Sequence, residues 1–223
     1  MAAAWTLVSA AKWAGADVAK FQIYEVDKLF PTKEIVANGK NWYEEVKKTE
    51  LSQEQVKGLS VYCKQLDIEF FASAFDVERI GWLESLGVRR HKIASRFRDT
   101  ETLKSIKATK KEVILSLPPG GFVPESFMNY SRVKYLYCVP EYPTPLEHLE
   151  LEGIGFPVPY AGFSDHTVGI EAACVSISRG ATIIEKHFTL DRKDTRGPDH
   201  ICSATPKELK KLIDFARKVE QIL

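Results

Sequence analysis

The sequence is poor in cysteine, and its four cysteines do not form a CxxC pair or any other close pair: Cys63, Cys138, Cys174 and Cys202. Wide spacing of this kind favours reduced, buried thiols over a disulfide framework, and reduced thiols are typical of cytosolic proteins. We therefore expect a cytoplasmic protein. The cysteines and the tryptophans are assigned to the hydrophobic core.

Long apolar runs and an excess of charge are absent too. No stretch reaches the roughly 18 uninterrupted apolar residues that a membrane helix needs, so no membrane span is expected. The opening "MAAAWTLVSAAKWAGAD" lacks a basic region and carries Trp5, Lys12 and Trp13 at helical spacings, which predicts an amphipathic helix and not a leader peptide. Lysine plus arginine number 31 against 30 aspartate plus glutamate, so no basic field indicates a nucleic-acid partner. Any anion must be held by a local site.

What is present is a regular alternation of strand-like and helix-like segments. With 44% hydrophobic and 27% charged residues, residues 1–223 are interpreted as one globular domain. The alternation predicts a parallel sheet with helical crossovers. The predicted strands lie at 17–23, 68–76, 89–95, 112–117, 133–139, 158–164 and 181–187.

The predicted fold is an α/β barrel of the TIM type. A (β/α)8 barrel has eight strands, and the first one is missing here because the chain opens on a helix. The alternative is an open, doubly wound sheet, which binds ligands at one switch point. Polar residues end strand after strand in this sequence, and that favours the barrel, incomplete at its first strand.

Polar side chains at the carboxyl ends of parallel strands gather at one mouth. Lysines and hydroxyls there would hold a phosphate or a carboxylate. Lys20 and Lys92 lie inside apolar strands, where an unpaired lysine is costly to bury, so a ligand or an ion pair is expected for each. Taken singly, the serines could be small polar fillers. The strand-end set comprises Lys20, Gln22, Ser73, Lys92, Ser95, Ser116, Tyr142, Ser164, Asp165, His166, Glu185, Lys186 and His187.

Two histidines follow neighbouring strands. His166 in "GFSDHT" and His187 in "IIEKHF" flank one helix, and a right-handed βαβ unit would bring both to the same edge of the sheet. Neutral imidazoles suit a divalent transition metal and leave positions open for water and substrate. Such binding is expected to weaken below about pH 6, where a free imidazole is protonated. The alternative is that both histidines only form hydrogen bonds, and Asp199 in "RGPDH" could be a turn residue.

Several motifs occur together in a recognisable order: "AGADVAKFQIYEVDKL", "YCKQLDIEFFASAFD", "HKIAS", "VILS", "CVPEYPTP", "GFSDHTVGIE", "IIEKHFTLDR" and "GPDH". In this order the sequence resembles the N-acetylneuraminate (sialic acid) synthase family over nearly its whole length. The resemblance implies a barrel enzyme that condenses phosphoenolpyruvate with N-acetylmannosamine or a related N-acetylated amino sugar and releases phosphate, using Mn²⁺ or Mg²⁺. Legionaminic, pseudaminic and spore-coat polysaccharide synthases look similar, so the sugar is left open.

The resemblance also implies roles for single residues. His166 and His187 would be the metal ligands and, with Lys92, the catalytic residues, while Tyr142 and Asp199 would face the sugar. The metal would polarise the sugar aldehyde for attack by C3 of phosphoenolpyruvate. The phosphoenolpyruvate cradle would comprise Lys20, Ser73, Lys92, Ser95, Ser116 and Ser164.

The sequence also departs from the family pattern. The family's first strand with its acidic residue is expected to be missing, and so is the C-terminal antifreeze-like domain, whose arginine reaches a partner's sugar site; a homodimer is therefore left open. Phe97 lies near the place of a glutamate, Pro140 replaces an Asn or Ser, and "SLPPGG" replaces the start of a helix. Two alternatives follow: a weak or inactive homologue that binds metal, phosphate or sugar, and another phosphoenolpyruvate or aldol enzyme on the same barrel.

Overall fold

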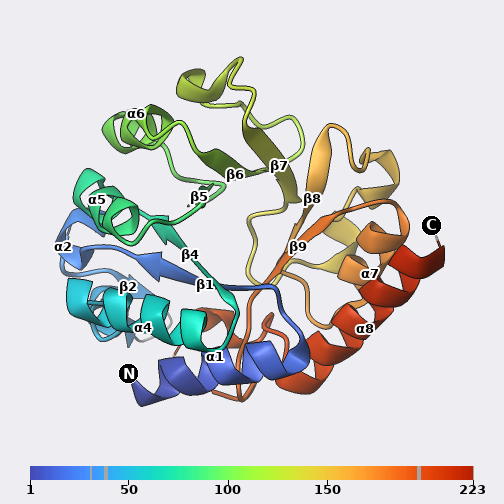
Figure 1. Cartoon of the computed structure of the whole chain (residues 1–223), viewed down its shortest axis with the longest axis horizontal. Coiled ribbons are helices and arrows are strands. Elements are labelled where there is room, and N and C mark those ends of the chain that lie inside the picture. The colour runs from blue at the N-terminus through green and yellow to red at the C-terminus, as the bar shows by residue number, and fades with distance from the viewer. Residues whose placement is uncertain (31, 38–39, 195–196, 223) are drawn as a thin grey trace.

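A seven-stranded parallel sheet forms the centre of the fold (Figure 1). The computed structural model describes residues 1–30, 32–37, 40–194 and 197–222. The strand order β1-β4-β5-β6-β7-β8-β9 follows the chain, and the strands match the predicted ones with small shifts at their ends. Their bounds are β1 (Val18–Ile23), β4 (Glu69–Ala74), β5 (Arg90–Ile93), β6 (Glu112–Leu117), β7 (Val133–Cys138), β8 (Tyr160–Asp165) and β9 (Ile183–Lys186).

The sheet curls into a barrel that is open on one side. Among the described residues, β1 pairs only with β4, and β9 pairs only with β8, which confirms the prediction of an incomplete barrel. A side-chain contact bridges the two edges, since Lys20 Nζ of β1 lies 2.8 Å from Glu185 Oε1 of β9. The first and last helices, α1 (Ala2–Ala14) and α8 (Pro206–Ile222), pack side by side (Figure 1).

Helices on the outside of the sheet connect most of the strands (Figure 1). α4 begins at a capping box, in which Ser52 Oγ accepts from the backbone N–H of Gln55 and the Gln55 side chain accepts from the backbone N–H of Ser52. No helix in the described part of the chain has the length and apolar content needed to span a membrane. The connecting helices are α4 (Gln53–Gln65), α5 (Val77–Ser85), α6 (Thr100–Ala108) and α7 (Glu171–Ser178).

Two crossovers contain short 3-10 turns in place of an α-helix. Pro118 and Pro119 open the connection between β6 and β7, and neither can sit inside a helix. This connection contains η1 (Glu125–Phe127), and the one between β7 and β8 contains η2 (Leu146–His148) and η3 (Leu151–Gly153).

The polar segment after β1 forms two short helices and a small two-stranded sheet. These elements lie beside the carboxyl end of β1 and outside the main sheet. A last 3-10 turn, η4, precedes α8. The bounds are α2 (Val26–Leu29), β2 (Val36–Ala37), β3 (Lys40–Asn41), α3 (Trp42–Lys47) and η4 (Pro198–His200).

An apolar layer fills the barrel near the amino ends of its strands. Phe71, Ile114 and Leu136 are buried there, and Val18 and Ile183 from the two edge strands pack against them. A larger cluster lies between the sheet and the outer helices. The inside of the barrel is therefore packed at its base, which leaves the opposite end for a ligand.

The assignment of the tryptophans to the core is wrong for two of them. Trp5 is 44% exposed and Trp13 is 61% exposed, because both lie on the outer side of α1 while Val8 and Ala11 face the core. Three of the cysteines are buried, as predicted, and Cys174 is half-buried; Cys138 is buried among polar groups and not in the hydrophobic core.

Candidate phosphate and metal site

A polar layer lies directly above the apolar layer, toward the carboxyl ends of the strands. Residues two apart on a strand point to the same face, so Ser73 follows Phe71 and Ser116 follows Ile114 on the inner face, and Lys92 follows Arg90 in the same way. Strand pairing sets Ser73 level with Lys92, and Ser164 level with Glu185. The layer consists of Lys20, Ser73, Lys92, Ser116, Cys138, Ser164 and Glu185.

Two lysines in this layer share one carboxylate. Glu185 lies 2.8 Å from Lys20 and 3.5 Å from Lys92, whose side chain is only 2% exposed. Burial by itself raises the pKa of Glu185, but the two ammonium groups outweigh it and hold that pKa below its usual value. Burial lowers the pKa of Lys92, which Glu185 partly opposes. With both lysines protonated, the cluster carries one positive charge more than Glu185 neutralises.

Buried hydroxyls surround the lysines. Lys92 Nζ donates to Ser116 Oγ at 2.8 Å. Ser73 Oγ and Ser95 Oγ are buried and have no hydrogen-bond partner among the described residues. Buried polar groups are normally satisfied, so orphan donors beside excess positive charge indicate a place for an anion. The predicted cradle residues are thus brought together, with Ser95 just beyond the end of β5.

The two histidines meet above the polar layer, as predicted. The ring centroids of His166 and His187 lie 5.4 Å apart, and the Tyr142 ring lies 4.2 Å from His166 and 5.7 Å from His187. His166 Nδ1 donates to the Val139 carbonyl at 3.1 Å, and within the described part of the chain Nε2 makes no hydrogen bond. His187 Nδ1 lies 3.8 Å from a carboxylate oxygen of Asp199, so the predicted sugar-facing residues Tyr142 and Asp199 border the histidine pair.

Both imidazoles are neutral near pH 7. Burial lowers the pKa of His166, and burial together with the nearby charge of Lys20 lowers the pKa of His187 to about 3. The neutral form is the one that a metal requires. Competition between protons and the metal for these imidazoles was expected below about pH 6, the value for a free imidazole. In the folded protein the lowered pKa values move this competition to lower pH.

The donor set fits a metal ion held by two protein ligands. Among the described residues, no group of three or more His, Cys, Asp and Glu side chains is arranged to hold a metal. Two neutral imidazoles, one oriented through its other ring nitrogen by a carbonyl, suit a divalent transition metal. The remaining coordination positions would be left to water and substrate.

Comparison with known proteins decides the family. The NeuB family matches residues 7–223. The chain belongs to the NeuB family. Its relatives include N,N'-diacetyllegionaminic acid synthase of Legionella pneumophila, 35% identical over 97% of this chain and 67% of that protein, and N-acetylneuraminate-9-phosphate synthase of Mus musculus, 31% identical over 97% and 66%. The chain spans about two thirds of the length of these relatives.

A solved structure supports the same family and fold. The N-acetylneuraminic acid synthetase of Leptospira borgpetersenii superposes with a TM-score of 0.85 at 29% identity, covering 99% of this chain and 79% of that one. Both the sialic acid synthase resemblance and the barrel prediction are thereby confirmed.

This NeuB-family chain keeps the predicted departures at the rim of the site. The Phe97 ring packs edge-on against the Phe75 ring at 5.5 Å, where the resemblance implies a glutamate. The neighbouring Arg96 donates to the carbonyl of Pro140, which ties the end of β5 to the end of β7. A hydrophobic pair and a guanidinium therefore occupy this part of the rim.

Three residues of the site region differ from their sequence interpretation. Cys138, assigned only to the core, lies in the polar layer with its Sγ 3.9 Å from His166 Nδ1. Asp165 and Lys186, grouped with the strand-end set, pair with each other at 2.9 Å and lie outside the polar layer. Side chains alternate between the two faces of a strand, so Asp165 and Lys186 point away from the inward-facing Ser164 and Glu185 that precede them. This alternation could have excluded both from the inner set.

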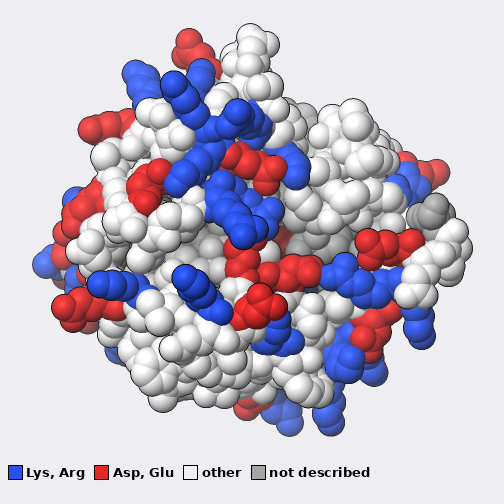
Figure 2. All heavy atoms as spheres, in the orientation of Figure 1, with Lys and Arg blue, Asp and Glu red and all other residues white. Residues whose placement is uncertain are grey.

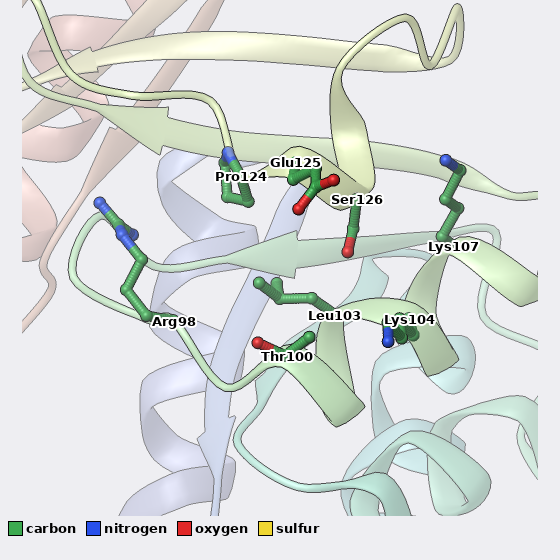
Figure 3. A pocket seen from close by; sticks show the side chains of 8 residues that line it. All are labelled: Arg98, Thr100, Leu103, Lys104, Lys107, Pro124, Glu125 and Ser126. Carbon is green, nitrogen blue, oxygen red and sulfur yellow. The ribbon is translucent and has the colours of Figure 1, made fainter.

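Two hollows lie on the surface of the molecule. One of about 530 Å³ lies between α6 and η1 and is lined by Arg98, Lys104 and Lys107 among others (Figure 3). The other, of about 470 Å³, borders the rim described above, because Phe75 and Phe97 line it together with residues of α2, α5 and α6. Lysines and arginines mix with acidic residues over the face shown in Figure 2, so no broad field of one sign singles out either hollow.

Proposed function

We propose that this chain condenses phosphoenolpyruvate with N-acetylmannosamine or a related N-acetylated amino sugar and releases phosphate. The observation that carries the proposal is the cradle, in which Lys20 and Lys92 share Glu185 beside the orphan hydroxyls of Ser73 and Ser95. An anion with many oxygens would satisfy these donors together. The relatives' names, which are those of acidic-sugar synthases, support this reaction class.

The lysines and serines hold phosphoenolpyruvate in this proposal. Lys20 and Lys92 neutralise its phosphate and carboxylate, and the buried setting strengthens both interactions because water does not screen them. Serine hydroxyls at the ends of four strands, one of which is the β5 strand that carries Lys92, donate to the same anion. They are Ser73, Ser95, Ser116 and Ser164.

The sugar enters from the rim, above the phosphoenolpyruvate. Tyr142 is 45% exposed and borders the histidine pair, and Asp199 approaches from the side of His187. His166 and His187 would hold Mn²⁺ or Mg²⁺, which when bound supplies Lewis-acid polarisation of the sugar aldehyde. C3 of phosphoenolpyruvate bonds to the aldehyde carbon, water adds to C2, and phosphate leaves.

Calorimetry with phosphoenolpyruvate tests the cradle. Binding should be lost in the double variant Lys20→Ala with Lys92→Ala, because two of the charges that hold the anion are removed. The matched control is Lys104→Ala with Lys107→Ala, which removes two lysines from the outer hollow of Figure 3 and should leave the affinity unchanged. Unchanged affinity in the first variant would exclude the cradle.

Phosphate release in the presence of N-acetylmannosamine, and of other N-acetylated amino sugars, tests the reaction. Release that requires both substrates supports the condensation. Release with a different aldehyde instead would indicate another phosphoenolpyruvate enzyme on the same barrel.

A second candidate is a weak or inactive homologue that binds metal, phosphate or sugar. The aromatic pair of Phe97 and Phe75 favours it, because a hydrophobic ring cannot move protons where the family has a glutamate. Loss of one acid or base group typically costs about 10²-fold or more in rate. Phosphoenolpyruvate binding without phosphate release would establish this candidate, whereas turnover of about 1 to 10³ per second would exclude it.

A further inference from the structure

A buried ion pair joins β8 to β9 at the point where both histidines leave the sheet. Asp165 and Lys186 are the last paired residues of the two strands, and their side chains are 0% and 2% exposed. Lys186 Nζ donates to Asp165 Oδ2 at 2.9 Å and to the Thr167 carbonyl at 2.6 Å. The pair is thus cut off from water and fixed by two directional contacts.

The second carboxylate oxygen of Asp165 is used as well. It accepts from the backbone N–H of Thr167 and from the Thr167 hydroxyl, each at 2.8 Å. Asp165 and Thr167 flank His166 in the chain, and Lys186 directly precedes His187. The Lys186 ammonium group therefore contacts the residues on both sides of His166, and Lys186 itself directly precedes His187.

The barrel is open beside β9, so the contacts between β8 and β9 determine how the two histidines are placed. Among the described residues, β9 has a single strand partner, β8, and its other edge is joined to the main sheet by side-chain contacts of Glu185 with Lys20 and Lys92. Beyond Lys186 the chain is held by the His187 carbonyl, which accepts from the Ala204 backbone at 2.7 Å. The separation of the two imidazoles thus depends on how β8 and β9 are fastened to each other.

We propose that Asp165 and Lys186 are positioning residues that set the separation and orientation of His166 and His187 for a divalent metal ion. The proposal rests on the metal role in the proposed function. An ion pair with satisfied hydrogen bonds defines one register between two strands, whereas apolar side chains of the same size would permit small shifts. Groups that orient metal ligands typically change metal affinity by about 10- to 100-fold when they are lost.

The test avoids Lys186→Met, which would leave a buried carboxylate unpaired and impair folding. It uses two other variants of the full chain. Asp165→Asn with Lys186→Gln replaces the ion pair by two neutral amides that can bond to each other, and Lys186→Arg keeps the charge. The matched control is Glu69→Gln with Arg90→Gln, which neutralises an ion pair between β4 and β5 at the other end of the sheet. Urea unfolding verifies that each variant is folded.

Manganese titration followed by electron paramagnetic resonance should show a loss of affinity of about tenfold or more in the amide variant, partial recovery in Lys186→Arg and no change in the control pair. Inorganic phosphate should bind to all of these variants as to the parent, because the cradle lysines are untouched. Parent-like manganese affinity in the folded amide variant would overturn the proposal. An equal loss in the control pair would also overturn it, since general destabilisation would then explain the effect.

Nuclear magnetic resonance of the histidine side chains gives a readout that does not depend on metal. The chain has five histidines, so single His→Gln variants assign the signals of His166 and His187. Their rings should show a through-space contact in the parent that weakens in the amide variant. If the parent bound no manganese, the metal role in the proposed function would fail, and this contact would still decide the positioning: its persistence in the amide variant would overturn the inference.

Discussion

The hydroxyls of Ser73 and Ser95 are buried without a partner among the described residues, an arrangement that costs the folded protein stability. A buried, unsatisfied polar group costs about 1–3 kcal/mol. Such a cost is expected at a binding site whose missing partner is the ligand.

Ser73→Ala and Ser95→Ala should therefore leave the stability of the chain unchanged or raise it slightly, while phosphate affinity falls about tenfold for each, because hydrogen bonds to charged groups contribute about 1.5–3 kcal/mol. Urea unfolding and phosphate calorimetry measure the two effects. Ser176→Ala is the control, since Ser176 Oγ already donates to the Ala172 carbonyl inside α7. A loss of stability without a loss of phosphate affinity would show that the two serines only fill space and do not bind the anion.

Phe97 allows a gain-of-function experiment. Phe97→Glu places a carboxylate near the position that the family resemblance assigns to an acid-base group, and it should raise the rate of phosphate release by about 10-fold or more if that group handles the reacting water. Phe97→Gln has nearly the same shape without the charge and should not raise the rate. Equal rates in the two variants would show that a carboxylate at this place contributes nothing.

At the scale of single elements, the start of α4 can be tested directly. Ser52→Ala removes the hydroxyl that accepts from the Gln55 N–H and should cost about 1 kcal/mol in the free energy of unfolding. Ser60→Ala, in the interior of the same helix, should be neutral or slightly stabilising because alanine is the better helix former. A neutral effect of Ser52→Ala would mean that packing alone holds this helix end.

The strands and crossovers were the predictable part of the fold, because β-branched runs and helical periodicity are local signals. The capping box of α4 and the irregular tract after Pro118 were predictable for the same reason. The hairpin of β2 and β3 was not, since residues 24–50 have neither period.

The site was predictable as a set of residues but not as a geometry. The order of the motifs located Lys20, Lys92, His166 and His187. It did not indicate that Glu185 lies between the two lysines, because that contact joins residues 165 positions apart in the chain. The lowered pKa values of the histidines also depend on burial, which the sequence does not state.

At the scale of the whole molecule, buried histidines predict acid sensitivity. Burial lowers the pKa of His91 and His166, and that of His187 falls to about 3. Each side chain therefore binds a proton more readily in the unfolded chain than in the folded one. Stability is complete above the ordinary imidazole pKa of about 6.5 and falls below it by up to about 1.4 kcal/mol per pH unit for each histidine.

Urea unfolding at about pH 7.5 and about pH 5.5 should show this loss. His91→Gln should make stability depend less steeply on pH, because one histidine that binds a proton only in the unfolded chain is removed. Equal stability at both pH values would contradict the buried, neutral state of the three histidines.

The open edges of β1 and β9 should make these two strands open locally more often than the inner strands. A strand with one neighbour can fray without unfolding the domain, so amide hydrogens of β1 and β9 that point away from the sheet should exchange with deuterium sooner than those of β5 and β6. The candidate site straddles this seam, with Lys20 on one edge and Glu185 and His187 on or beside the other. A phosphoenolpyruvate molecule bound between these residues would connect the two edge strands. Adding it should therefore slow amide hydrogen exchange most in β1 and β9.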